Sequence, residues 1–129
     1  MNNYKGKRLI SKLHPDINPQ TLIDKRGGIF TFYPNKHPIC EWSYIITNVN
    51  STRGFHYHKE FDEYILIISG SGIYVEKYAD KLLPTYVSEG DCIFIPRFTP
   101  HIYYPATDTK KIAMITKKWN ECTEPITKI

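Results

Sequence analysis

Two histidines and a glutamate stand close together in the middle of the sequence, at a spacing that can bring their side chains to one point. His56 and His58 are two residues apart, and in a β-strand such a pair projects from one face because the side-chain period is two. Glu63 follows five residues after His58, which leaves room for a bend that returns its carboxylate to the imidazoles. His101, directly after Pro100, offers a third imidazole from another strand. The four groups predict one convergent polar site.

Three imidazoles and one carboxylate support two kinds of chemistry. They can hold a divalent metal such as Zn²⁺, Mn²⁺, Fe²⁺ or Ni²⁺ with positions open for water or substrate, so all four residues are candidate metal ligands. The same groups can transfer protons without a metal. The spacing leaves both chemistries open. The other two histidines, His14 and His37, each precede a proline, and we interpret them as structural, hydrogen-bonded residues.

The apolar residues that must position this site favour strands. The chain contains 18 Ile and 10 Tyr, but only six Leu and three Ala, and β-branched and aromatic residues are enriched in strands. Turn signals recur at short spacing, which is typical of sandwiches and barrels. The length of 129 residues suits one domain. We therefore predict a single all-β domain over residues 1–129, built as a small barrel of two antiparallel sheets.

The pattern also predicts where individual elements lie. Residues 64–68 and 92–95 are continuous apolar runs, so we expect them between two covering layers. One short helical turn is expected over residues 18–24, and an extended arm over residues 119–129 that packs on the domain or on a neighbouring subunit. The predicted strands are residues 28–33, 42–49, 63–69, 73–77, 92–96, 101–104 and 111–116.

Composition excludes several classes of protein. Cys40, Cys92 and Cys122 are odd in number and form no C-x-x-C pair, which indicates a reducing compartment, the cytoplasm, and neither a disulfide framework nor a zinc ribbon. No apolar run approaches the roughly 20 residues that span a bilayer, so we expect no membrane association. The net charge of +4 favours anionic ligands. There is no helix-turn-helix pattern or basic helix, so no nucleic-acid partner is expected.

Through the site residues the sequence resembles the cupin superfamily. The first cupin motif is H-x-H, then E after three or four residues, then G after six more; the second contains G, P and H at set intervals. The matching residues are His56, His58, Glu63 and Gly70 in the first motif, and Gly90, Pro96 and His101 in the second. The second motif departs at Phe98, which replaces Gly, and at Pro105, which replaces Asn. The resemblance implies a small jelly-roll barrel.

A narrower resemblance covers residues 22–116. The D-x-R-G element at Asp24 to Gly27, the strand around Tyr44 and the R-G-x-H-x-H element from Arg53 to His58 occur in this order in the cupins that act on nucleotide-linked 4-keto-6-deoxyhexoses. These include the 3,4-ketoisomerases of dTDP-4-keto-6-deoxyglucose and the dTDP-4-dehydrorhamnose 3,5-epimerases. The resemblance implies an isomerase that removes a proton beside the ketone, forms an enediol and requires no cofactor. It also implies a homodimer, since small cupins expose strand edges that a partner covers.

The same resemblance implies roles for individual residues. One of His56 and His58 is expected to be the base, and Tyr44 to be a proton donor or substrate anchor, although Tyr44 also suits the core. Arg53 and Arg26 are expected to bind phosphate, since the guanidinium fork pairs with two phosphate oxygens. For Arg26 a solvated turn residue is the rival interpretation. Without a metal, Glu63 and His101 would line the substrate site.

Two other classes of function remain open. The complete set of three His and one Glu suits a metal-dependent cupin enzyme, such as a dioxygenase or a small-carbohydrate isomerase. A cupin that binds a sugar without catalysis would need the same fold and cavity. The sugar-nucleotide isomerase is our leading hypothesis, because the D-x-R-G and R-G-x-H elements and the positive charge suit a diphosphate-linked substrate.

Overall fold

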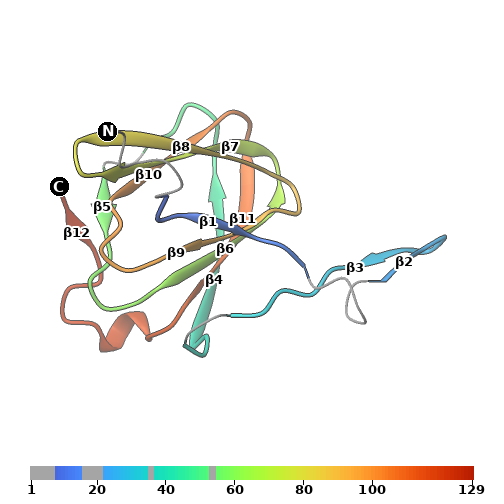
Figure 1. The fold of residues 1–129 in the computed structure, drawn as a ribbon, viewed down its shortest axis with the longest axis horizontal. Helices are drawn as coiled ribbons and strands as arrows, with labels where there is room; N and C mark the ends of the chain where they lie inside the picture. The colour runs from blue at the N-terminus through green and yellow to red at the C-terminus, as the bar shows by residue number, and fades with distance from the viewer. Residues whose placement is uncertain (1–7, 16–21, 35–36, 53–54) are drawn as a thin grey trace.

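The computed structural model describes residues 8–15, 22–34, 37–52 and 55–129, and this part of the chain is almost entirely β-structure (Figure 1). One turn of 3-10 helix, η1 (Trp119–Glu121), precedes the last strand. The all-β prediction is confirmed. The strands are β1 (Ser11–Leu13), β2 (Leu22–Asp24), β3 (Gly27–Ile29), β4 (Glu41–Thr47), β5 (His56–Tyr57), β6 (Glu63–Ser69), β7 (Ser71–Tyr78), β8 (Lys81–Ser88), β9 (Cys92–Ile95), β10 (His101–Pro105), β11 (Thr109–Ile115) and β12 (Thr127–Lys128).

Two antiparallel five-stranded sheets face each other, as in a jelly roll (Figure 1). One sheet has the order β1-β9-β6-β11-β4 and the other the order β12-β5-β10-β7-β8. Within the described ranges no strand pairing joins the two sheets, so the barrel is not closed by hydrogen bonds. Strands distant in sequence therefore become neighbours, and side chains from both sheets meet in the space between them.

The core lies between the sheets and consists mainly of isoleucine and aromatic side chains. Strand β9 is buried along its whole length because β1 and β6 flank it and the other sheet covers its inner face. This confirms that residues 92–95 lie between layers. The core residues are Ile10, Ile65, Ile67, Tyr74, Val87, Ile93, Ile95, Tyr103 and Ala113.

The chain passes from one sheet to the other at Gly70, between β6 and β7; the glycine-rich sequence of residues 69–72 would suit a hairpin turn, but β6 and β7 do not pair. Gly70 has φ +87°, a conformation that L residues with a Cβ rarely adopt. A Cβ at this position would also overlap the carbonyl oxygen of Asp108. Backbone conformation and close packing both require glycine here, at the link between two strands that line the cavity described below.

Six of the seven predicted strands are found within two residues of the expected ends, and three other expectations need correction. Strand β3 stops at Ile29, so the predicted strand over residues 28–33 is shorter. Residues Leu22–Asp24 form strand β2 and not the end of a helical turn; residues 18–21 of that prediction lie outside the described residues. Strand β8 was not predicted because Pro84 interrupts the pattern, and β8 tolerates a proline because it is an edge strand.

Two segments extend beyond the paired sheets. Strands β2 and β3 form a hairpin that projects from the body of the molecule (Figure 1). The segment after β11 instead returns to its own domain, where β12 pairs with β5 through Thr127 opposite Tyr57 and Lys128 opposite His56. The C-terminal arm was expected to pack on the domain or on a neighbouring subunit. In the structure it packs on a sheet of its own domain. The described residues contain no helix long and apolar enough to cross a membrane.

Candidate active site

A cavity of about 190 Å³ opens between the two sheets, and its polar lining comes from both. The polar side chains in its wall include His56, His58, Glu63, Tyr74, His101 and Lys111. A second hollow, of about 470 Å³, shares Ile45, Glu63 and Trp119 with the first. The space beside the imidazoles therefore continues past Trp119.

Strand pairing brings the three histidines together. His56 on β5 lies directly opposite His101 on the antiparallel strand β10, and their ring centroids are 4.7 Å apart. His58 follows β5 on the same face, with its ring 5.1 Å from that of His56 and 5.5 Å from that of His101. The prediction that the H-x-H pair and His101 converge is confirmed.

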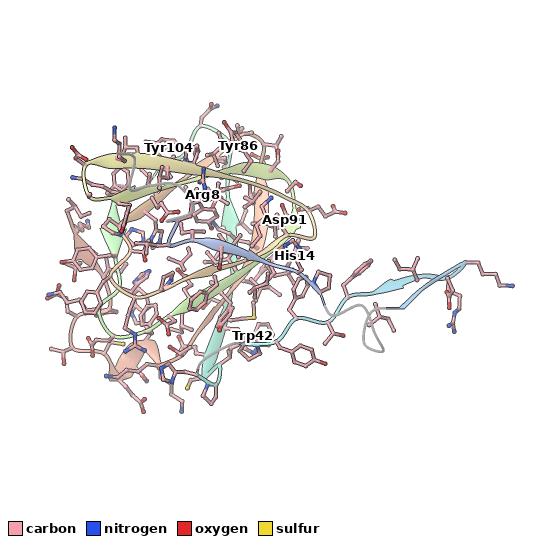
Figure 2. All side chains as sticks on the ribbon, in the orientation of Figure 1. Arg8, His14, Trp42, Tyr86, Asp91 and Tyr104 are labelled. Carbon is pink, nitrogen blue, oxygen red and sulfur yellow. The ribbon has the colours of Figure 1, made fainter. Side chains whose placement is uncertain are left out.

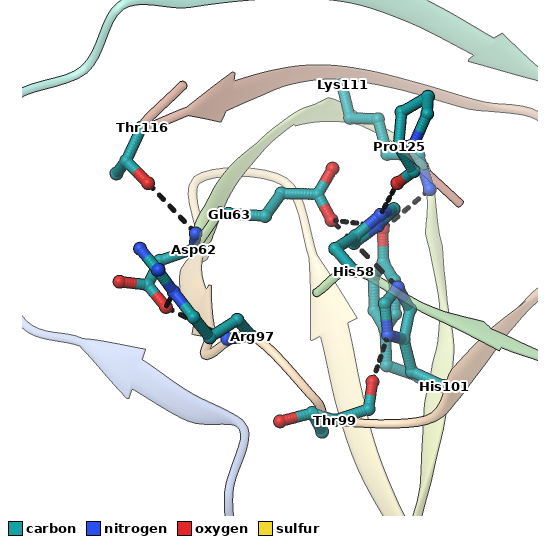
Figure 3. A network of polar contacts seen from close by, with 10 residues as sticks. His58, Asp62, Glu63, Arg97, Thr99, His101, Lys111, Thr116 and Pro125 are labelled. Carbon is teal, nitrogen blue, oxygen red and sulfur yellow. Dashed lines mark hydrogen bonds and ion pairs between the residues drawn. The ribbon is translucent and has the colours of Figure 1, made fainter. Parts of the chain in front are cut away.

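Backbone carbonyls fix the orientation of two of these rings (Figure 3). Nδ1 of His58 lies 2.8 Å from the carbonyl oxygen of Pro125, and Nδ1 of His101 lies 2.8 Å from that of Thr99. A carbonyl oxygen only accepts, so each Nδ1 carries the hydrogen and donates it. Each ring then presents Nε2 to the Glu63 carboxylate, at 3.5 Å from His58 and 3.9 Å from His101.

The environments of these groups move their pKa values in different directions. Burial raises the pKa of the Glu63 carboxyl, but the hydrogen bond and charge of His58, with the charges of His101 and Lys111, outweigh it and lower the pKa. Burial lowers the pKa of His58, but the Glu63 carboxylate and the Pro125 carbonyl outweigh it and raise the pKa. For His101 burial prevails and lowers the pKa to about 4. The carboxylate thus lies between one imidazole whose pKa is raised and another whose pKa is lowered, an arrangement suited to proton transfer.

The same donor set also fits a divalent cation. One ring nitrogen from each of His56, His58 and His101 lies within 4.8 Å of the others. Metal-binding histidines usually donate their second N–H to a carbonyl or carboxylate, as His58 and His101 do here. The residues therefore suit Zn²⁺, Mn²⁺, Fe²⁺ or Ni²⁺, with Glu63 beside them as an oxygen donor.

Two other predicted site residues lie elsewhere. Tyr44 is 54% exposed on the outer face of β4, because its neighbour Ile45 takes the inward position and lines the cavity. Arg26 lies in the turn of the projecting β2–β3 hairpin, where it forms an ion pair with Asp24 at 2.6 Å. The structure brings neither side chain to the cavity of its own chain, which favours the solvated-turn interpretation of Arg26. Arg53 lies outside the described residues.

Two parts of the site were not found from the sequence. Lys111 and Tyr74 line the cavity from opposite sheets, and the ammonium of Lys111 lies 2.6 Å from the Tyr74 hydroxyl. The sequence held a signal for Lys111, since it occupies an inward position of β11 between Thr109 and Ala113. The C-terminal segment is the other part: Trp119 and Ile126 line the cavity, and Pro125 holds His58.

Comparison with solved structures finds a similar fold in several other proteins. The chain is similar to the WlaRB TDP-quinovose 3,4-ketoisomerase from Campylobacter jejuni, with a TM-score of 0.78 and 17% identity over 93% of this chain and 92% of that one. It is also similar to a 3,4-ketoisomerase from Helicobacter canadensis, with a TM-score of 0.73 and 20% identity over 87% and 86% of the two chains.

A third similar structure is ChmJ, a 3'-monoepimerase from Streptomyces bikiniensis, with a TM-score of 0.75 and 10% identity over 95% of this chain and 70% of that chain. No family model and no curated protein matches the sequence. At these identities the likeness establishes the fold: a cupin-like jelly roll shared by 3,4-ketoisomerases and a 3'-monoepimerase, as the resemblance in the sequence implies.

Proposed function

We propose that the protein is an isomerase of nucleotide-linked 4-keto-6-deoxyhexoses, acting as a 3,4-ketoisomerase or as a 3- or 3,5-epimerase. The observation that carries the proposal is the histidine cluster around Glu63, set in a cavity between the sheets of this fold. The substrate class is supported by a similar structure, a 3,4-ketoisomerase from Thermoanaerobacterium thermosaccharolyticum in complex with TDP-4-keto-6-deoxyglucose.

The proposed reaction uses the acidity of a carbon next to a ketone. A base removes the proton at C3, the C3–H electron pair forms a C3–C4 double bond, and negative charge develops on the C4 oxygen. The base returns its proton to C4 and the proton of the C3 hydroxyl passes to the C4 oxygen, which moves the ketone to C3. Return to the opposite face of C3 gives epimerisation instead. In either case no net oxidation or reduction occurs, so the proposed chemistry requires no cofactor.

The base in this proposal is one of His56 and His58. His56 lies in the cavity wall beside the other two imidazoles, and His58 presents Nε2 to Glu63. The Glu63 carboxylate would stabilise an imidazolium that forms on His58, since opposite charges at short range favour the ionised pair. Glu63 and His101 would then act on the substrate through these rings or by direct contact.

The experiment that tests the function follows dTDP-4-keto-6-deoxyglucose by NMR in the presence of the purified protein. We expect conversion to a 3-keto or epimerised sugar nucleotide, at a rate unchanged after treatment with EDTA. Binding of the sugar nucleotide without conversion would contradict the enzyme and support the alternative of a non-catalytic sugar-binding cupin.

A second candidate is a metal-dependent cupin enzyme, favoured by the convergence of three imidazoles whose rings are oriented by carbonyls. In that case His56, His58, Glu63 and His101 would be the ligands, and the metal would supply Lewis acidity or redox chemistry. Elemental analysis separates the two candidates. One bound metal per chain, with no conversion of the sugar nucleotide, would support the metal enzyme and overturn our first proposal.

We also propose a homodimer formed through the outer face of β4. Strand β4 is an edge strand, and its outward side chains Trp42, Tyr44 and Ile46 are all exposed, Trp42 to 68%. The nearby hairpin adds exposed Ile23 and Ile29. Figure 2 shows Trp42 on the side of the molecule from which the hairpin projects. Exposed apolar side chains on an unpaired edge are typical of a surface that a second copy covers.

The double variant W42E/I46E is expected to convert the dimer to a monomer, because two carboxylates would have to be buried in an apolar interface. Light scattering at micromolar concentration measures the mass directly. Tyr86, exposed to 66% on β8 in the other sheet, provides the matched control, and Y86E should remain dimeric. A monomeric unmodified protein, or a dimer that survives W42E/I46E, would contradict this interface.

A cytoplasmic location remains part of the proposal. It is supported by the three cysteines, which are unpaired in the structure and so need no oxidising compartment.

A further inference from the structure

Lys111 is a charged residue buried in the wall of the cavity. It is 6% exposed, and its ammonium lies 2.6 Å from the hydroxyl of Tyr74 and 3.8 Å from the centre of the Tyr103 ring. Lysine is almost never buried to this extent without partners, because removing its charge from water costs free energy. Its contacts with the Tyr74 hydroxyl and the Tyr103 ring offset part of that cost.

The fold places this ammonium beside the histidine cluster. Side chains on β11 alternate, so Thr109, Lys111 and Ala113 point between the sheets while Lys110 points to solvent. Tyr74, on the facing sheet, has its ring centroid 6.4 Å from that of His101, and Lys111 approaches the cluster from the side of β11 (Figure 3). The charge of Lys111 also lowers the pKa of Glu63. Lys111 and the imidazoles thus face the same cavity from different walls.

Tyr74 holds the ammonium in place. The Lys111 ammonium donates to the Tyr74 hydroxyl oxygen, and burial raises the pKa of the phenol well above its ordinary value, so Tyr74 stays neutral. The contact fixes the direction of a flexible side chain and leaves its positive charge in the cavity.

We propose that Lys111, positioned by Tyr74, is the catalytic residue that binds the ketone oxygen of the substrate and stabilises the enediolate. This inference rests on the proposed isomerase function. When the base takes the C3 proton, the carbonyl electron pair moves to the C4 oxygen, and the ammonium neutralises the charge that develops there. When the C3 ketone forms, the base returns its proton to C4 and the proton of the C3 hydroxyl passes to the C4 oxygen. A fixed cation in a site of low polarity stabilises such an anion more strongly than water does.

The test compares K111M, K111R and K110M by NMR turnover of dTDP-4-keto-6-deoxyglucose and by calorimetric binding of dTDP. Removing one donor to a developing oxyanion typically lowers kcat by about 10²- to 10³-fold, which is the loss expected for K111M. Its affinity for dTDP should stay within about twofold of that of the unmodified protein, since the proposed contact is to the sugar ketone and not to the nucleotide. K111R should recover part of kcat. K110M, one residue away on the solvent face, should match the unmodified protein.

A folded K111M with kcat within threefold of the unmodified protein would overturn the role of Lys111 while leaving the isomerase function intact. Absence of turnover in the unmodified protein would instead overturn the proposed function itself. If K111M does not fold, Y74F keeps the ring in the core and removes only the acceptor. We expect its kcat to fall about tenfold with unchanged dTDP affinity, and an unchanged kcat would overturn the positioning by Tyr74 and with it the proposal.

Discussion

Replacing either histidine of the H-x-H pair by asparagine is expected to abolish most of the turnover and leave the fold intact. A positioned acid–base group contributes roughly 10²- to 10⁴-fold in rate, so H56N and H58N should each lose a large part of that factor. Asparagine retains a polar side chain but cannot take a proton from C3. NMR turnover of dTDP-4-keto-6-deoxyglucose measures the loss, and thermal unfolding shows whether the fold survives.

The two variants also distinguish the base from its partner. The variant that lacks the base should lose exchange of the C3 hydrogen with solvent, whereas loss of the other imidazole should slow a later proton transfer and retain some exchange. His14 is exposed and is not among the residues that line the cavity, so H14N is the matched control that should keep full turnover. Full turnover in both H56N and H58N would contradict proton transfer by this cluster.

Replacing Glu63 by glutamine is expected to have the second largest effect. The carboxylate raises the pKa of His58, so its removal lowers that pKa and moves any acid limb due to His58 in the pH profile of kcat/KM to lower pH. A hydrogen bond to a charged group is worth about 1.5–3 kcal/mol, which corresponds to roughly a 10- to 100-fold fall in kcat/KM for E63Q.

Glu60 gives the matched control for this variant. It accepts hydrogen bonds from Lys117 and from the backbone of Glu124 outside the cavity, so E60Q should leave the pH profile unchanged. A profile for E63Q that coincides with that of the unmodified protein, or an acid limb at higher pH, would show that Glu63 does not act on His58.

The histidine cluster could be predicted from the sequence because it depends mainly on the two-residue alternation of side chains along a strand. His56 and His58 share a face at any register, and a proline-flanked His101 that starts a strand needed only one antiparallel pairing to meet them. The strands of the core were found for the same reason, since long apolar or alternating runs leave little freedom. The unpredicted strands are short, as in β5 and β12, or interrupted by proline, as in β8.

The alternation of side chains along β4 explains why Tyr44 lies outside the cavity. On β4 the outward positions carry Trp42, Tyr44 and Ile46, while Ser43 and Thr47 are among those that face inward. The outer face is therefore the more apolar one, the reverse of the usual pattern, and Tyr44 does not reach the cavity as the role implied by the resemblance requires. The same inversion supports the proposed dimer, in which this face would be covered.

The contacts that complete the site are long-range and could not be obtained from spacing. Lys111 and Tyr74 are 37 residues apart and meet only because the two sheets face each other. The carbonyl of Pro125 reaches His58 across 67 residues because two-residue strand β12 joins the edge of the sheet. Neither contact leaves a periodic signal in the sequence. A lysine at an inward position of an alternating strand, however, indicates a buried charge.

The central claim is that the histidine cluster removes the proton next to the ketone, and hydrogen exchange tests it most directly. The protein is incubated with dTDP-4-keto-6-deoxyglucose in D₂O, and the sugar protons are followed by NMR. We predict loss of the C3 proton signal and incorporation of deuterium at C4 or C3 at a rate that falls at least tenfold in H56N or H58N. Retention of the C3 proton in the presence of the unmodified protein would contradict the account.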